Sequence, residues 1–235
     1  MGELLVMVPT RGRRAQCERF MKTFQETSDL EKTTLVFVTD SDDDAYQDMD
    51  WGIASAMLVE PREFLVKKLN IAAMKFLDDY RVLMFAGDDH VFDTPGWDRL
   101  MLAELDEMGG TGMVYPDDKR RNDIPEIVMI SSDIVRELGW FAGPSQEHYF
   151  IDNIWGELGK RVGFIRFCGE AVIRHLHYTV DSTVVRDEIY LSAEEKFGNS
   201  DREAFFAWQR DVMPFQVAQL RRKFSKDIEW LFSKV

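Results

Sequence analysis

Three possible metal ligands stand side by side near the middle of the chain. Asp88, Asp89 and His90 follow residues 82–86, five apolar residues that suit a buried strand, after a single glycine. Two adjacent carboxylates repel each other unless a cation or hydrogen-bond donors lie nearby, and ligands of open α/β sheets gather at the carboxyl ends of strands. We therefore expect the active site at this turn; a solvated acidic turn is the alternative.

Two later stretches carry side chains that could act in the same site. Asp152 lies near the first turn of a predicted amphipathic helix, and His175 and His177 stand two residues apart in a segment that we expect to be extended. In such a segment both imidazoles point the same way, which favours metal binding. Asp152 could instead complement the helix dipole at the surface, and the histidines could be hydrogen-bonded structure, so both alternatives stay open.

The elements that must position these side chains alternate between strand and helix. Consecutive apolar residues predict buried strands at residues 4–8, 34–38, 56–59 and 82–86. Helical spacing of apolar residues follows the first and third of these strands, and this alternation predicts an α/β sheet. A basic loop after the first strand could bind an anion, whereas most of the acidic loop after the second should be solvated, with Asp40 adjoining the strand end.

Composition restricts the class of protein. The chain has 235 residues, of which 45% are hydrophobic, so it can bury one substantial core. Cys17 and Cys168 lie far apart without metal-binding spacing, and the chain has no basic-then-apolar leader and no run of eighteen apolar residues. We therefore expect a cytoplasmic protein without membrane insertion. A net charge of −13 argues against general attraction to nucleic-acid phosphates.

The pattern changes in the C-terminal part of the chain. Apolar residues keep helical spacing from Met213 to Leu231, which predicts a long amphipathic helix with a basic cluster at residues 221–226. We expect a catalytic domain at residues 1–200 and a helical extension at residues 201–235. This extension would pack on the domain or on a second subunit of a homodimer, while a membrane-surface or nucleic-acid role for its basic face is the alternative.

The order of the polar motifs resembles that of the GT-A glycosyltransferases, of the small family 2-like type found in bacteriophages and bacteria. The motifs are Val-Pro-Thr-Arg-Gly-Arg after the first strand, an acidic loop after the second, Lys68 and Asn70 before the fourth, and Gly-Asp-Asp-His after it. Tyr-Pro-Asp-Asp, Tyr-Phe-Ile-Asp-Asn-Ile-Trp and His-Leu-His follow in the order that this family requires. The resemblance covers about residues 4–190. It implies a Rossmann-like, mixed and mostly parallel sheet flanked by helices, with a nucleotide-sugar donor across the strand ends.

The resemblance also implies roles for individual residues. The residues expected to contact the donor are Pro9, Thr10, Arg11, Arg13, Asp40, Lys68, Asn70 and Asp88. Asp89 would be the firmer ligand of Mn²⁺ or Mg²⁺, with Asp88 and His90 as further candidates and with His177, or else His175, completing the site. Asp152 would be the general base. The residues expected to contact the acceptor are Trp97, Tyr115, Asp118 and Trp155.

These expectations describe a metal-dependent, inverting glycosyltransferase with UDP as the expected nucleotide. The metal would stabilise charge on the departing diphosphate, and an imidazole ligand would shift the preference from Mg²⁺ toward Mn²⁺. The acceptor hydroxyl could belong to modified DNA, protein or polysaccharide. Two alternatives remain: a nucleotidyltransferase, which should carry a glycine-rich basic loop that this chain lacks, and a catalytically silent protein that binds sugar nucleotides. The chain also lacks the glycine-rich motifs of P-loop NTPases and dinucleotide-binding enzymes.

Overall fold

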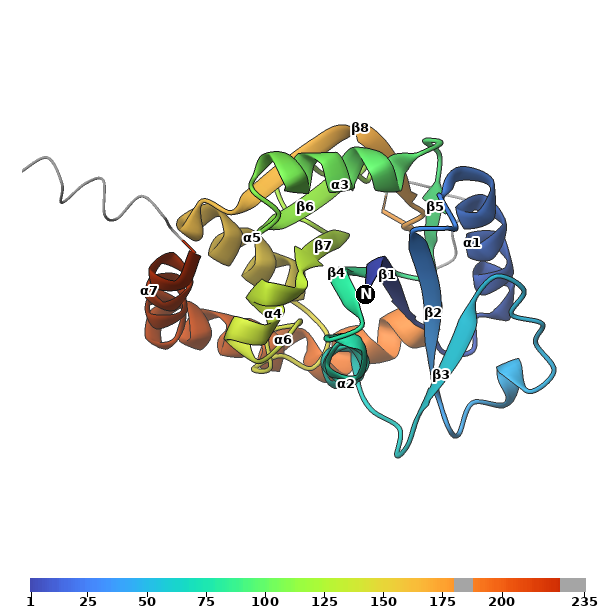
Figure 1. Ribbon diagram of the computed structural model, residues 1–235. Coiled ribbons are helices and arrows are strands. Elements are labelled where there is room, and N and C mark those ends of the chain that lie inside the picture. Colours follow the sequence, from blue (N-terminus) through green and yellow to red (C-terminus); the bar gives the residue numbers. More distant parts are fainter. Residues whose placement is uncertain (180–187, 225–235) are drawn as a thin grey trace, which may run out of the picture.

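A computed structural model describes residues 1–179 and 188–224, which form one twisted eight-stranded sheet with helices on both faces (Figure 1). The strands are β1 (Gly2–Pro9), β2 (Thr33–Asp40), β3 (Ser55–Val59), β4 (Tyr80–Phe85), β5 (His90–Phe92), β6 (Met113–Asp117), β7 (Val128–Ser131) and β8 (Ile165–His175). The helices are α1 (Arg14–Thr27), the short 3-10 helix η1 (Asp44–Tyr46), α2 (Leu65–Phe76), α3 (Trp97–Glu107), α4 (Ser132–Leu138), α5 (Ile151–Val162), α6 (Glu188–Asp211) and α7 (Met213–Phe224).

The N-terminal half of the sheet is parallel. Its strand order is β3-β2-β1-β4, and each neighbouring pair runs in the same direction. These strands are nearly continuous apolar runs because the sheet is covered on both faces. Because the four strands are parallel, their carboxyl ends lie at one edge of the sheet. The residues that follow β1, β2 and β4 lie at this edge. This confirms the four strands and the α/β class that the sequence predicts.

The C-terminal half mixes both directions. Strand β7 runs antiparallel to β4 and β6, whereas β8 runs parallel to β6. Residues 165–175 form one long strand, β8. Its far end pairs antiparallel with β5, which places His90 directly opposite His175. Strand β5 has only three residues, too few for a period to predict it.

Helices cover both faces of the sheet (Figure 1), and an apolar layer lies between the helices and the sheet on each face. Helices α1 and α3 pack on one face, and α2, α4, α5, α6 and α7 pack on the other. Trp97 and Trp155 are fully buried in these layers, where their indole N–H groups donate to Ser28 Oγ at 3.0 Å and to the Phe141 carbonyl at 2.8 Å. Neither tryptophan has exposed surface in this structure, and a contact of these two residues with the acceptor stays a prediction from the sequence. Helical spacing identified both as residues of an apolar helix face, but it did not show that other residues cover those faces completely.

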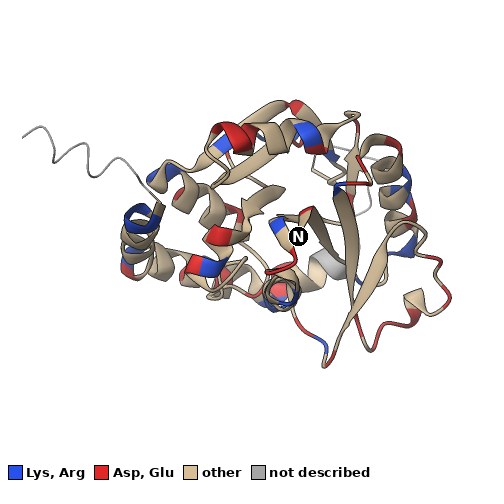
Figure 2. Ribbon diagram, viewed as in Figure 1, with Lys and Arg blue, Asp and Glu red and all other residues tan. Residues whose placement is uncertain are grey.

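The C-terminal helices belong to the same core. Phe205 and Trp208 of α6 and Leu220 of α7 are buried against the sheet, and α6 crosses the predicted boundary at residue 200. Pro214 occupies the first turn of α7, where its missing N–H costs nothing, and the helix is described as far as Phe224. The rest of the predicted helix lies outside the described residues. Basic residues gather at the end of α7 (Figure 2). Within the part of the chain that the structure describes, no helix is long and apolar enough to cross a membrane.

Candidate active site

A buried ion pair forms the first part of the site, at the carboxyl ends of β1 and β4. Asp88 Oδ1 accepts a hydrogen bond from Arg13 Nη1 at 3.0 Å, and Asp88 Oδ2 accepts one from Thr10 Oγ1 at 2.6 Å. Burial raises the pKa of Asp88, the Arg13 guanidinium opposes this change, and the neighbouring carboxylate of Asp89 adds to it. Tyr46, which the sequence did not predict as a site residue, contacts Thr10 through its hydroxyl at 2.7 Å.

Asp89, His90 and His175 form the second part. One potential ligand atom from each lies within 4.8 Å of the others, the only such group among residues 1–179 and 188–224. The pairing of β5 with β8 creates the cluster, since it places the two imidazole rings 4.5 Å apart. His177, the favoured fourth ligand, lies outside this group, with its Nδ1 2.8 Å from Thr179 Oγ1. Of the two histidines that the sequence offered, His175 is the one that lies in this group.

The protonation states of the two clustered imidazoles differ. Burial and the nearby His175 lower the pKa of His90 to about 4, so His90 is neutral at pH 7, as a metal ligand must be. Burial also disfavours the charged form of His175, but Asp89 and Glu126 raise its pKa overall to about 9. A cation binding to this cluster would replace the proton of His175 as the charge that balances the carboxylates.

The residues of this cluster fit a divalent transition metal. His90 Nε2 is buried and has no hydrogen-bond partner among the described residues, while His90 Nδ1 lies 2.8 Å from the Gly87 amide nitrogen. A Cβ at position 87 would lie 2.6 Å from Asp89 Oδ1, so a side chain there would displace the carboxylate. One carboxylate and two imidazoles suit Mn²⁺ better than Mg²⁺, which prefers oxygen ligands.

Glu126 supports the cluster from behind, and the sequence did not predict it. Glu126 Oε2 lies 2.8 Å from His175 Nδ1, and Glu126 Oε1 accepts a hydrogen bond from Arg120. Burial alone would raise the pKa of Glu126, but the hydrogen bonds from His175 and Arg120 lower it to about 2. A carboxylate behind a ligating imidazole fixes the orientation and tautomer of that ring. No local pattern marks Glu126, because 49 residues separate it from His175.

Glu126→Gln should weaken Mn²⁺ binding by about 10- to 100-fold. The amide has only one accepting atom, so it cannot serve both His175 and Arg120, and the imidazole loses its fixed orientation. Titration of free Mn²⁺ by electron paramagnetic resonance measures this change. Glu107→Gln is the matched control, since it removes only a surface contact to Arg166. Wild-type affinity in the Glu126 variant would show that this residue only fastens the preceding loop.

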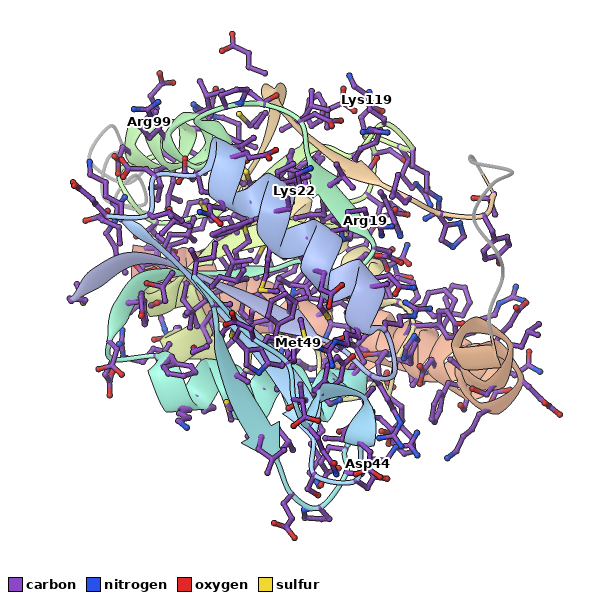
Figure 3. All side chains as sticks on the ribbon, turned by 90° about the vertical axis from the view of Figure 1, so that its right-hand side faces the viewer. Arg19, Lys22, Asp44, Met49, Arg99 and Lys119 are labelled. Atoms are coloured by element: carbon purple, nitrogen blue, oxygen red, sulfur yellow. The ribbon has the colours of Figure 1, made fainter. Side chains whose placement is uncertain are left out.

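A third group of charges lies at the carboxyl end of β2. Asp40 is 2% exposed, and its Oδ2 accepts from Lys68 Nζ at 2.8 Å and from Arg11 Nη1 at 3.1 Å. Asp40 Oδ1 is buried and has no hydrogen-bond partner among the described residues. Arg11 Nη1 also donates a hydrogen bond to Oδ1 of the exposed Asp42, at 2.6 Å. The acidic loop beyond is solvated as expected, with Asp44 on the surface in Figure 3. Asp40 therefore presents one unused acceptor atom at this edge of the sheet.

Three side chains that are expected to contact ligands form hydrogen bonds inside the protein. The Asn70 side chain accepts from the amides of residues 141 and 142 and donates to the carbonyl of residue 142, which ties α2 to the turn before α5. Tyr115 donates to the Asn122 carbonyl, and Asp118 accepts from the amides of residues 120 and 121. These hydrogen bonds fix the turn before α5 and the loop after β6. The contacts of Asn70 with a donor and of Tyr115 and Asp118 with an acceptor stay predictions from the sequence.

Asp152 lies in the first turn of α5 and is partly exposed. Its Oδ1 accepts from the amide of the next residue at 2.8 Å. Burial raises the pKa of Asp152, and the negative charge of Glu126 adds to this effect, while Arg121 opposes it. The charge of Glu126 thus affects the pKa of both Asp152 and His175. Pro9, the remaining expected donor contact, is the last residue of β1 at the same edge.

Comparison with solved structures identifies the fold. No family model matches the sequence, and no curated protein does. The mannosyltransferase PcManGT from Pyrobaculum calidifontis, in complex with GDP-Man and Mn²⁺, is 13% identical with a TM-score of 0.59, over 97% of this chain and 75% of that one. S. aureus TarS 1–349 with UDP-GlcNAc is 12% identical with a TM-score of 0.55, over 95% and 73%.

The same TarS fragment with UDP is 10% identical with a TM-score of 0.55, over 73% of this chain. That match spans only 59% of the TarS chain, so this protein corresponds to about three fifths of it. At these identities the likeness concerns the fold alone. The chain has the mixed, mostly parallel α/β fold of the GT-A type, with a helical C-terminal region, that the order of its motifs implied.

Proposed function

We propose that this protein is a metal-dependent glycosyltransferase that transfers a sugar from a nucleotide-sugar donor, with UDP as the nucleotide, to an acceptor hydroxyl. One observation carries the proposal. Two buried polar atoms have no hydrogen-bond partner among the described residues: Asp40 Oδ1 at the carboxyl end of β2, and His90 Nε2 on the segment that follows β4. Strand β1 lies between β2 and β4, and the Arg13–Asp88 pair lies at the same edge of the sheet. A nucleoside diphosphate laid along this edge would meet a base-binding acceptor, a cationic side chain and a metal ligand in that order.

The unused oxygen of Asp40 supports a uracil base. Lys68 and Arg11 bind the other oxygen of the carboxylate, so Oδ1 can only accept a hydrogen bond from a ligand. The ring N–H of uracil is such a donor, whereas the equivalent ring nitrogen of cytosine is an acceptor and would be repelled. Guanine also offers ring N–H groups. Because both UDP and GDP-Man occur in the structural neighbours, guanine is the main competitor.

Charge on the leaving group is the central problem of the reaction. Asp89, His90 and His175 would hold a divalent ion, which when bound would supply positive charge to the departing diphosphate. Arg13, held against Asp88, adds a fixed guanidinium near the same strand ends. Glu126 keeps His175 oriented toward Asp89, with His175 Nε2 3.5 Å from Asp89 Oδ2. The side chains of this site are thus arranged before the substrate arrives, which lowers the cost of reorganisation.

Asp152 is the proton acceptor in this proposal. Its carboxylate takes the proton of the acceptor hydroxyl as that oxygen forms a bond to the anomeric carbon, and the bond to the diphosphate breaks with its electron pair. Attack from the face opposite the leaving group inverts the anomeric centre. The raised pKa of Asp152 supports this role, because a base with a pKa nearer the working pH accepts protons more effectively.

The acceptor in this proposal is a hydroxyl of a polysaccharide or a protein in preference to duplex DNA, because the net charge of −13 opposes a phosphate backbone. The family 2-like and bacteriophage-type assignments, the cytoplasmic location and a homodimer formed through the C-terminal helix stay predictions from the sequence.

A thermal-shift panel tests the donor. UDP with Mn²⁺ should raise the unfolding midpoint more than CDP or ADP, because a ligand that binds only the folded state stabilises it. UDP-sugars that pass this test are then assayed for release of UDP. Equal shifts with CDP and UDP would contradict the role of Asp40. Pyrophosphate release would support a nucleotidyltransferase, and binding without turnover would support a silent binding protein.

The pH dependence of turnover should report Asp152. The base must be ionised, and its pKa is raised above the ordinary aspartate value of about 3.9 by burial and by Glu126. Turnover at saturating donor should therefore fall as the pH decreases, with a midpoint above that of an unperturbed aspartate. UDP release measured from pH 4 to 8, with circular dichroism as a check of folding, gives this profile. A midpoint at or below 3.9 would contradict the environment assigned to Asp152.

A further inference from the structure

The loop before α5 is fastened to α6 by a single carboxylate. Asp201 is 2% exposed, and its Oδ1 accepts from the amide of Glu147 at 3.0 Å. Its Oδ2 accepts from the amides of His148 at 2.9 Å and Tyr149 at 2.7 Å. Three consecutive backbone N–H groups thus converge on a side chain more than fifty residues later in the sequence. Such charge-assisted hydrogen bonds are directional as well as strong.

The backbone at the end of this loop adopts an unfavourable conformation. Phe150 has a φ of 66°, a left-handed value that is costly for a bulky residue, and α5 begins at the next residue. The Phe150 ring stacks on Phe205 of α6, with ring centroids 5.4 Å apart and an interplanar angle of 19°. The contacts of α6 therefore compensate for a strained turn directly before the helix that carries Asp152.

We propose that Asp201 is a positioning residue for Asp152, which makes α6 part of the catalytic architecture. The inference rests on the proposed function, since it assumes that Asp152 is the base. Phe205 and Trp208 already provide apolar packing between α6 and the sheet. Burying a carboxylate costs desolvation energy, which an apolar residue at this position would avoid. The contribution specific to Asp201 is therefore to hold three backbone amides in place, and with them the first turn of α5. A shift of about 1 Å at a base is enough to slow proton transfer on the order of a hundredfold.

Asp201→Asn tests the proposal in the full chain. The amide has one accepting atom, so at least one of the three bonds is lost. Hydrogen exchange at the amides of residues 147–149 should become faster. The kcat for UDP release should fall by about 10- to 100-fold with the KM for the UDP-sugar unchanged. Glu203→Gln, an exposed change on the same helix, is the matched control and should alter none of these quantities.

A double-mutant cycle separates positioning from general stability. In an Asp152→Asn background, Asp201→Asn should cause almost no further loss of kcat, because the two residues act through one step. Additive losses, a KM that rises in parallel, or a kcat within twofold of wild type would each overturn the proposal. If Asp201→Asn does not fold, Phe205→Leu weakens the same anchorage and should give the same pattern. A wild-type protein without turnover on any sugar nucleotide would overturn the proposed function itself, whereas an active wild type with an unaffected Asp201→Asn would overturn only this inference.

Discussion

Asp152→Asn should lower the rate of sugar transfer by on the order of a thousandfold while UDP and Mn²⁺ still bind with wild-type affinity. The amide is nearly the same size as the carboxylate but cannot accept the proton of the acceptor hydroxyl. The proposed donor and metal contacts come from other elements, at the ends of β1, β2, β4 and β8. Steady-state release of UDP gives the rate, and calorimetric titration with UDP and Mn²⁺ gives the affinities.

Glu157→Gln provides a control for this variant on the same helix. Glu157 forms a surface pair with Arg161 at 3.2 Å, which contributes little, so its loss should leave turnover unchanged. The two variants thus differ mainly in which side chain of α5 is neutralised. Normal turnover by Asp152→Asn with intact donor binding would remove Asp152 as the base and require another proton acceptor near the acceptor site.

Asp89→Ala should abolish specific Mn²⁺ binding and reduce turnover by at least about a thousandfold, because metal catalysis supplies several kcal/mol to the transition state. Asp89 is the only carboxylate in the three-residue cluster of the described structure, so its removal leaves two imidazoles and no anionic ligand. The substitution also removes one of the two carboxylates that raise the pKa of His175; the other, Glu126, remains. Mn²⁺ binding followed by electron paramagnetic resonance measures the first effect directly.

Asp93→Asn is the matched control for the metal variant. Asp93 follows β5 and pairs with Arg174 on the surface at 2.7 Å, close in sequence to Asp89 but outside the cluster. Mn²⁺ affinity and turnover should stay at wild-type values. Full metal-dependent activity of Asp89→Ala would refute the metal assignment, whereas full activity without any added metal in the wild type would assign the leaving-group charge to Arg13.

The sequence alone determined the sheet edge at which this chemistry is expected. Runs of apolar residues that end abruptly in Thr10, Asp40 and Asp88 predict strands and also predict that polar groups follow each strand. Parallel strands bring those ends to one edge, so local patterns were sufficient to group residues that are up to 78 positions apart. The ordered motifs then implied the GT-A fold, which the solved structures confirm.

Other features depended on contacts that spacing cannot reveal. The period of an extended segment places His175 and His177 on the same side, but only the pairing of β5 with β8 places His90 opposite one of them. In the same way, helical period marked Trp97 and Trp155 as apolar-face residues without showing that both faces are completely covered.

Glu126 and Asp201 had no local signal for these roles, because His175, which Glu126 contacts, and the amides that Asp201 accepts from lie about fifty residues away along the chain. The sequence determines the face on which a side chain lies, since that follows from the backbone period. Only the tertiary structure decides which groups it meets there, because strand pairing and helix docking depend on all the contacts of the fold together.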